Sequence, residues 1–377
     1  MAVRVEDNQA LSGALIGGRY ALGEPLTTGG AAVVYRGWDT LRELGVALKS
    51  PRRDDSKSAA HTPEATAMLV GAIPLTELRW RLAREGQIMA SLSHPHIARI
   101  YNYIEVEGWP WLALELVEGV DLWRAASERG PFSPHAALDV GRQVCAALGA
   151  IHAIGIIHRD VKPRNIILSP GGHATLIDFD LAWSPVLGDN GEPDMIYGTP
   201  EYMSPEQAMG ERITAATDIY ALGVTLYELL AGRAPFHASS ASATMWRHVT
   251  ETPPPLREWR HDLPAPVERA VMRALAKEPR RRYPSAEAMA LALAQAQEEA
   301  RMTHAQFGWR ALTLLGSRPP ASLAPAPIAE TPEPATPASQ ADAKPGLWLM
   351  LTFWILALAS LTLTLIILLA LAQVMPE

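Results

Sequence analysis

The sequence predicts an α+β fold built as two lobes, followed by a linker and one membrane-spanning helix. Alternating apolar residues dominate up to about residue 117, whereas apolar residues three or four positions apart dominate from about residue 134. A third observation is a run of 28 residues without a charge, Leu347 to Val374. At about 1.5 Å per residue, a helix of this length spans a hydrocarbon core of roughly 30 Å.

The composition limits the classes of function. The formal net charge of -7 at pH 7 argues against a nucleic-acid partner, because phosphate backbones are bound by basic surfaces. Cys145 is the single cysteine, so no intrachain disulfide can form, and its apolar neighbours predict an inert buried thiol. The first residues contain no apolar segment of the kind found in secretory signals, so we expect the main part of the chain in the cytoplasm.

The first half predicts strands around one helix. Gly18 to Asp39 predicts a β-hairpin with a tip of small residues, which either covers phosphate groups or is an ordinary glycine-rich turn. Val46 to Lys49 predicts a short strand that ends in a lysine. Ser50 to Thr76 contains three prolines and no clean period, which indicates an irregular insertion.

The next segments return to regular patterns. Glu77 to Leu92 predicts a helix, and Glu85 lies on or near its apolar stripe, so this acid either reaches solvent or pairs with a cation. Two strands are expected at Ala98 to Val106 and Pro110 to Val117. Pro134 to Ile154 then predicts a helix.

The stretch from Ile157 to Leu168 carries the chemistry. It reads I-H-R-D-V-K-P-R-N-I-I-L, and it places Asp160, Lys162 and Asn165 on a tight loop between apolar runs. This combination suits phosphoryl transfer: a carboxylate accepts the hydroxyl proton, a lysine stabilises the phosphoryl charge, and an amide oxygen holds magnesium. The spacing matches the H-R-D-x-x-x-x-N pattern of protein-kinase catalytic loops.

The remaining soluble part predicts one more strand and then helices. Thr175 to Phe179 is a short apolar segment that contains Asp178, and Gly198 to Gln207 predicts a loop. Helices are expected at Thr217 to Ala231, Ser239 to Thr250, Pro266 to Ala276 and Ser285 to Ala300.

The C-terminal part predicts a membrane anchor. Ser317 to Pro345 is rich in Pro, Ala, Ser and Thr, which indicates an extended, disordered linker. More Lys and Arg residues precede the apolar run than follow it, so the positive-inside rule places the N-terminal domain in the cytoplasm, at an inner or plasma membrane. Ser360 and Thr364 form a small-x-x-x-small pair, a candidate homodimer contact. The expected divisions are a tail (1–14), a strand-rich lobe (15–117, insertion about 50–76), a helical lobe (118–312), the linker (313–346), the membrane helix (347–374) and an extracytoplasmic tail (375–377).

From about Arg19 to Ala300 the chain resembles the bacterial Hanks-type (eukaryotic-like) serine/threonine protein kinases, the PknB-like group. The motifs V-A-L-K, R-E-G-Q, H-R-D-V-K-P-R-N, D-F-D, S-P-E and D-I-Y-A-L-G occur in the family's order. The resemblance implies a bilobal protein-kinase fold and transfer of the ATP γ-phosphoryl group to Ser/Thr hydroxyls of protein substrates, including autophosphorylation, with Mg²⁺ or Mn²⁺.

The same resemblance assigns roles to residues. It implies that Asp160 is the catalytic base, that Lys162 contacts the γ-phosphate, and that Asn165 and Asp178 bind the metal. The implied nucleotide-binding residues are Leu26, Gly29, Gly30, Val34, Ala47, Lys49, Glu85, Glu115, Val117 and Ile167.

Within this set, Lys49 would grip the α- and β-phosphates and pair with Glu85, while Glu115 to Val117 would form the hinge after a Leu114 gatekeeper. The resemblance also implies supporting contacts: Arg282 with Glu206, Asp218 with the catalytic-loop backbone, and Thr199 with Asp160 and Lys162.

Three features depart from the family pattern. Thr27, Gly29 and Ala32 stand in the glycine loop where the family has G-x-G-x-x-G. Asp180 replaces glycine in D-F-D, which either adds metal affinity or restricts the flip that glycine permits. Leu181 to Tyr197 contains no threonine and one serine, Ser184. These departures leave an alternative function, a weak or inactive pseudokinase that acts as a membrane-bound signalling scaffold.

Overall fold

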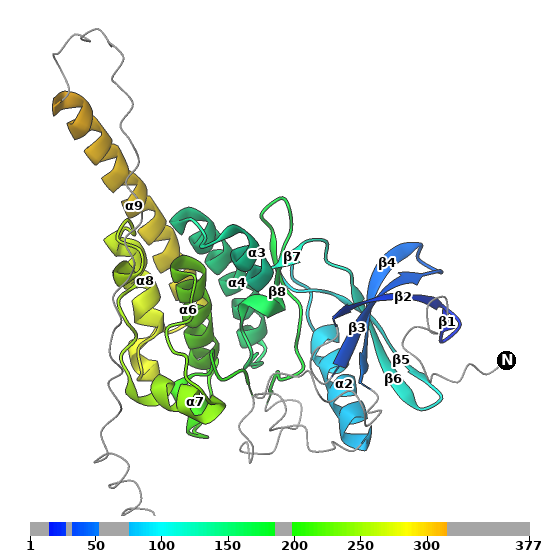
Figure 1. Cartoon of the computed structure of the whole chain (residues 1–377). Coiled ribbons are helices and arrows are strands. Elements are labelled where there is room, and N and C mark those ends of the chain that lie inside the picture. The colour runs from blue at the N-terminus through cyan, green and yellow to red at the C-terminus, as the bar shows by residue number, and fades with distance from the viewer. Residues whose placement is uncertain (1–14, 28–31, 53–74, 185–197, 315–377) are drawn as a thin grey trace, which may run out of the picture. The chain divides into compact units, whose positions relative to one another are not determined.

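The computed structural model describes residues 15–27, 32–52, 75–184 and 198–314. The chain divides into two units, residues 1–316 and 317–377, and the second unit lies outside the described residues. The first unit contains a strand-rich lobe and a helical lobe (Figure 1). The prediction of a bilobal α+β fold is therefore confirmed.

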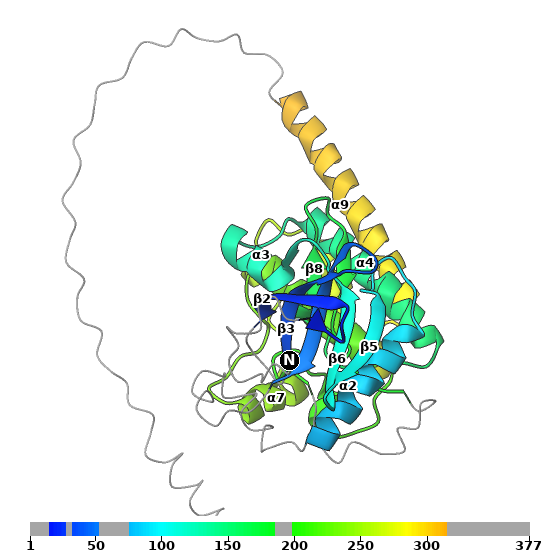
Figure 2. The same ribbon diagram turned by 90° about the vertical axis from the view of Figure 1, so that its right-hand side faces the viewer.

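The N-terminal lobe is an antiparallel sheet with one helix against it. The six strands have the order β1-β2-β3-β4-β6-β5. Helix α2 packs along β5 and β6, and it buries Leu82, Ile88 and Met89 from one face (Figure 2). The bounds are β1 Leu15–Ile16, β2 Tyr20–Thr27, β3 Ala32–Asp39, β4 Leu44–Pro51, α2 Leu75–Ala90, β5 Ile100–Val106 and β6 Trp109–Glu115.

The C-terminal lobe packs its helices around α6. The residues of α6 from Thr217 to Tyr227 are all buried, because α4 and α8 pack against this helix and most of its residues are apolar. A small sheet of order β7-β8-β9 lies beside these helices. The bounds are β7 Val120–Asp121, α3 Leu122–Arg129, α4 Pro134–Ala153, η2 Pro163–Asn165, β8 Ile166–Leu168, β9 Ala174–Leu176, α5 Pro205–Ala208, α6 Ala215–Ala231, α7 Ala241–Thr250, η4 Leu256–Glu258, α8 Ala265–Ala274, η5 Pro279–Arg281 and α9 Ala286–Leu314.

Local sequence signals explain several helix ends. The Ser133 side chain accepts a hydrogen bond from the backbone N–H of Ala136 and caps α4, whose first residue is Pro134. The chain leaves α6 through Gly232, which has a left-handed conformation with φ of 74°. These signals fix where the helices begin and end, whereas packing decides which face is buried.

The structure differs from the sequence-based bounds at several points. Ser50 belongs to β4, where it pairs with Val33 and its hydroxyl donates to the carbonyl of Pro110, and Thr76 belongs to α2, so the predicted insertion of 50–76 is shorter. Its residues 53–74 lie outside the described part of the chain. The predicted strand Thr175–Phe179 is Ala174–Leu176, because its partner β8 is only three residues long.

The short elements β7 and α3 were not predicted, and the predicted loop Gly198–Gln207 ends earlier, because Ser204 caps the short helix α5 from Pro205. Helix α9 continues past Ala300 to Leu314, so it includes residues 313 and 314 of the predicted linker. The rest of that linker and the predicted membrane helix at 347–374 lie outside the described residues. Within the described ranges, no helix is long and apolar enough to cross a membrane.

Candidate active site

The predicted catalytic loop is anchored by hydrogen bonds to the first turn of α6. The buried carboxylate of Asp218 accepts hydrogen bonds from the backbone N–H groups of His158 (2.9 Å) and Arg159 (2.8 Å), and it lies 2.8 Å from Nε2 of His152. Burial alone would raise the pKa of Asp218, but the hydrogen bond and charge of His152 and the charge and backbone N–H of His158 keep this pKa below its usual value. The contact expected between Asp218 and the loop backbone is present.

The loop backbone is strained at Arg159. Its φ of 67° is left-handed, which for a residue with a Cβ costs on the order of 1–3 kcal/mol. The conformation persists because Asp218 holds the N–H of Arg159 and the side chain of Gln207 donates to its carbonyl at 3.1 Å. This strain lies directly before the predicted base.

The carboxylate of Asp160 is held by three side chains. Lys162 Nζ lies 2.6 Å from Oδ2, Asn165 Nδ2 donates to the same oxygen at 3.0 Å, and the Thr199 hydroxyl donates to Oδ1 at 2.8 Å. Lys162 also donates to Thr199 at 2.7 Å, which completes the expected contacts of this threonine. Oδ1 therefore keeps one lone pair that can accept a proton from a substrate.

A second cluster lies between the lobes. Lys49 Nζ donates to both carboxylate oxygens of Glu85, at 2.7 and 2.8 Å, and to Asp178 Oδ1 at 2.7 Å. The ion pair expected between Lys49 and Glu85 is therefore present. Burial by itself would lower the pKa of Lys49, but the charges of Asp178 and Glu85 raise it above its usual value. Burial raises the pKa of Glu85 to about 7 against the opposing charge of Lys49. The Lys49 side chain therefore keeps its positive charge at neutral pH.

Asp180, the acid that departs from the family pattern, is accommodated without backbone strain. Glu43, Glu107 and Arg159 are the non-glycine residues with positive φ among those described, so Asp180 does not need the conformation that glycine supplies. Its N–H lies 3.4 Å from Asp178 Oδ1, and burial raises the pKa of the Asp180 carboxyl. The D-F-D loop is therefore compatible with the position of Asp178 beside Lys49.

The predicted metal ligands offer hard oxygen donors. The amide nitrogen of Asn165 donates to Asp160, so the amide oxygen of Asn165 is left as an acceptor. Asp178 uses Oδ1 for Lys49 and retains Oδ2. In the described part of the chain, no group of three or more His, Cys, Asp or Glu side chains could hold a metal alone. This donor set fits Mg²⁺, which protein sites bind through one or two carboxylates together with substrate phosphates.

The predicted nucleotide-binding residues are brought together around β4. Val34 of β3 pairs with Lys49, and Ala47 pairs with Leu114 of β6. Ala47 belongs to the main hydrophobic core, and Val34 and Val117 pack against this core. Among the backbone hydrogen bonds of the described residues, none uses the N–H or the carbonyl of Val117. The chain then passes close to β8, the strand that contains Ile167. This close approach is possible because Gly119 has no Cβ, since a Cβ there would lie 2.4 Å from the carbonyl oxygen of Leu168.

Two further predicted residues lie near the ends of strands, and two lie outside the description. Leu26 is on β2 and is exposed, and Glu115 ends β6, where its side chain accepts from the N–H of Arg99 at 3.1 Å. Gly29 and Gly30 lie outside the described residues.

The contact expected between Arg282 and Glu206 is present and buried. Both η nitrogens of Arg282 donate to the Glu206 carboxylate, at 2.7 and 2.8 Å. Three backbone carbonyls accept its remaining donors. Burial alone would raise the pKa of Glu206, but the hydrogen bond and charge of Arg282 lower it. Helix α5, which contains Glu206, is thereby fixed to the segment of the helical lobe that carries Arg282.

Sequence reasoning missed three supporting residues: His152, which contacts Asp218; Gln207, which holds the carbonyl of Arg159; and Trp123, which lies under Arg164. Each acts across at least 41 positions of sequence, so no local pattern marks it.

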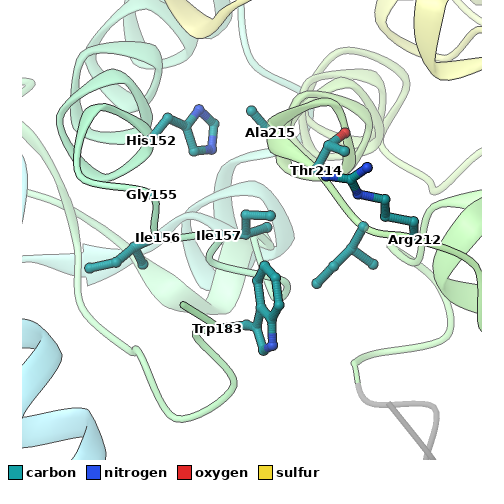
Figure 3. A pocket seen from close by; sticks show the side chains of 9 residues that line it. His152, Gly155, Ile156, Ile157, Trp183, Arg212, Thr214 and Ala215 are labelled. Atoms are coloured by element: carbon teal, nitrogen blue, oxygen red, sulfur yellow. The ribbon is translucent and has the colours of Figure 1, made fainter. Parts of the chain in front are cut away.

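A cavity of about 230 Å³ lies beside the start of the catalytic loop, with His152, Trp183 and Arg212 around it (Figure 3). None of the predicted catalytic, metal or nucleotide residues lines this cavity.

A fold with strand-rich and helical lobes, and a site that combines a buried Lys–Glu pair with an H-R-D-x-x-x-x-N loop, define the protein-kinase class. Residues 20–306 match the protein kinase domain family, and the chain belongs to this family. This confirms the resemblance seen in the sequence. Membership implies the use of ATP and a divalent metal.

Curated relatives share this part of the chain. The serine/threonine-protein kinase PrkC of Bacillus subtilis is 33% identical over 297 residues, which cover 79% of this chain and 43% of the relative. The serine/threonine-protein kinases PknB of Mycolicibacterium smegmatis and Mycobacterium tuberculosis are 37% and 36% identical over 279 residues, 72% of this chain. The aligned part covers 42% of each PknB, so the match spans less than half of these relatives' length.

Proposed function

We propose that this chain is an ATP-dependent protein kinase that transfers the γ-phosphoryl group to Ser/Thr hydroxyls of proteins, itself included. The observation that carries the proposal is Lys49, which contacts Glu85 and Asp178 at once, each at 2.7 Å. Phosphoryl transfer by protein kinases requires the lysine–glutamate ion pair, and it also requires the aspartate at the position of Asp178 to hold Mg²⁺, which it would do when the metal is bound. The scaffold alternative is not proposed, since no predicted catalytic side chain is missing and no observation favours it.

In the proposed reaction, Asp160 accepts the proton of the acceptor hydroxyl while the hydroxyl oxygen bonds to the γ-phosphorus. The bond from that phosphorus to the β–γ bridging oxygen breaks, and ADP leaves. Lys162 is 2.6 Å from Asp160 and stabilises the charge of the transferring group. Thr199 and Asn165 keep the carboxylate of Asp160 oriented.

We assign the remaining predicted roles to the same site. In this proposal Lys49 would hold the α- and β-phosphates, and Val34, Ala47, Val117 and Ile167 would contact adenine, while Leu26, Gly29, Gly30 and Glu115 remain predicted nucleotide-binding residues. Asn165 and Asp178 hold Mg²⁺ or Mn²⁺, which when bound neutralises developing phosphate charge.

We also propose that the kinase is held at the inner face of a membrane. The support is the uncharged run from Leu347 to Val374 and the Pro- and Ala-rich stretch before it. The divisions at 15–117, 118–312, 313–346 and 347–374 belong to this proposal, as does a homodimer through Ser360 and Thr364. Deletion of 347–374 should move the protein from the membrane fraction to the supernatant; unchanged sedimentation would contradict the tether.

The kinase proposal is tested by autophosphorylation of the full-length chain in detergent, with radiolabelled ATP and Mg²⁺ or Mn²⁺. An Asp160→Asn variant is the matched control, because it keeps the size of the side chain and removes its basic oxygen. We expect label in the wild type and none in the variant. A folded wild type that binds ATP yet labels neither itself nor any added protein contradicts the proposal.

A further inference from the structure

An arginine that is not used by the predicted chemistry lies between two residues that are. Arg164 is the middle residue of η2, between Lys162 and Asn165 in the catalytic loop, and it is exposed. Its guanidinium carbon lies 3.5 Å from the ring centroid of Trp123 on α3, the shortest cation–π contact among the described residues. The guanidinium is thus fixed against an indole face.

This contact leaves the hydrogen-bonding edge of the guanidinium free. Stacking uses the flat face of the group, whereas its five N–H donors lie in its plane. Among the hydrogen bonds and ion pairs of the described residues, none uses Arg164, in contrast to Arg282, whose side chain makes five hydrogen bonds. A stacked guanidinium with free N–H groups is suited to a carboxylate or phosphate.

The position of Arg164 relative to the predicted base is fixed on both sides. The neighbouring Asn165 donates to Asp160 at 2.9 and 3.0 Å, so η2 is tied to the base. Helix α3 packs against η2, and Asp121 caps this helix by accepting from the N–H of Arg124 at 2.9 Å. Arg164 thus lies four positions from the predicted base, on a short segment that is fixed at both sides.

Acidic residues nearby do not neutralise Arg164 by direct contact. Burial raises the pKa of Glu228, the Tyr202 hydroxyl donates to this carboxylate at 2.6 Å, and Glu201 and Arg164 add smaller charge effects of opposite sign. Glu228 is thus hydrogen-bonded to Tyr202, and among the ion pairs of the described residues none joins Glu228 to Arg164. A basic substrate side chain would meet Arg164 as a like charge, while an acidic one would meet it as a partner.

We propose that Arg164, held on Trp123, is a substrate-recognition residue that binds an anionic side chain, a carboxylate or a phosphate, near the acceptor hydroxyl of the protein substrate. The inference rests on the proposed kinase function. A charge-assisted pair of this kind corresponds to about a tenfold preference in kcat/KM over a neutral side chain.

The test uses the full-length protein and acceptor peptides that differ at one position. Glu, phosphoserine, Ala or Arg is placed in turn at each position flanking the acceptor, and kcat/KM is measured for every peptide. We expect Glu or phosphoserine to exceed Ala about tenfold at one or more positions. Arg164→Ala should remove this ratio, and Arg164→Glu should favour the Arg peptide. A larger effect of phosphoserine assigns phosphate as the ligand, and an equal or larger effect of Glu assigns carboxylate.

Arg273→Ala is the matched control, because Arg273 on α8 is also exposed and lies over an aromatic ring, 4.5 Å from the centroid of Tyr283. This variant should keep the wild-type ratio. The ratio compares two peptides within one preparation, so partial misfolding of a variant cancels. The inference is overturned if an active wild type shows no anion preference, or if the preference survives Arg164→Ala. Either result leaves the proposed kinase function standing. A wild type that phosphorylates no peptide and not itself overturns the proposed function instead.

Discussion

Replacement of Arg282 by methionine should be among the most destabilising single changes in the helical lobe. The Arg282 side chain is 0% exposed, and all five of its hydrogen bonds are buried or partly buried. Methionine fills a similar volume but offers no donor. The change would leave the Glu206 carboxylate, itself 3% exposed, with the Thr217 hydroxyl as its remaining side-chain donor at 2.9 Å.

The size of the effect follows from this geometry. Removal of one partner of a buried ion pair costs about 3–5 kcal/mol, because the other charge stays buried without compensation. We therefore expect the free energy of unfolding to fall by about 4 kcal/mol, a large part of the 5–15 kcal/mol typical of a domain. Arg282→Met combined with Glu206→Gln should lose less than the sum of the two single variants, since the stranded charge is then absent.

The loss should also depend on pH. In the wild type Arg282 keeps the pKa of Glu206 below its usual value, whereas without Arg282 burial alone would raise this pKa above that of the unfolded chain. A carboxyl with a raised pKa in the folded state favours folding below its unfolded pKa, and this contribution is lost as the pH rises through the folded value. The defect of Arg282→Met should therefore be smaller at pH 5.5 than at pH 7.5.

Urea unfolding followed by tryptophan fluorescence measures these differences in the wild type, both single variants and the double variant. The reasoning is refuted if Arg282→Met lowers the free energy of unfolding by less than about 1 kcal/mol. It is equally refuted if the effect of Glu206→Gln is the same with and without Arg282.

Three other predictions follow from single contacts. Lys49→Met should abolish phosphoryl transfer but keep cooperative unfolding, because Glu85, whose pKa burial raises to about 7, can take up a proton; full activity in radiolabel assays would show that Lys49 is misassigned. The pKa of buried His248 is lowered to about 3, by burial and then by Lys277, so the unfolded chain binds more protons below pH about 6.5. Stability should fall there by about 1.4 kcal/mol per pH unit, and His248→Gln should flatten this slope in urea titrations at pH 5.5 and 7.5. Ser184 is 1% exposed, so mass spectrometry of the folded, autophosphorylated kinase should find no phosphate on it.

Much of the fold was predictable because it depends on local patterns. The alternating apolar residues of the predicted hairpin, Gly18 to Asp39, fall on β2 and β3. The helical period of Glu77 to Leu92 gave α2 to within two residues at each end. The catalytic loop was readable because Asp160, Lys162 and Asn165 lie within six positions, so their chemistry is encoded in spacing alone. Element ends were less certain: β9 ends at Leu176 because β8 offers no longer partner, although the apolar pattern of its own sequence continues.

By itself, the sequence determined the class of chemistry, the order of the two lobes and the identity of the residues able to carry out the reaction. Only the tertiary structure decided the contacts that no motif implied: Lys49 contacts Asp178 across 129 positions, and His152 contacts Asp218 across 66. It alone placed Arg164 on Trp123 with its donors free. The physical reason is that the sequence does not show whether a charged side chain is solvated or buried. Only tertiary packing determines which partner a buried charge meets, and this partner determines its role.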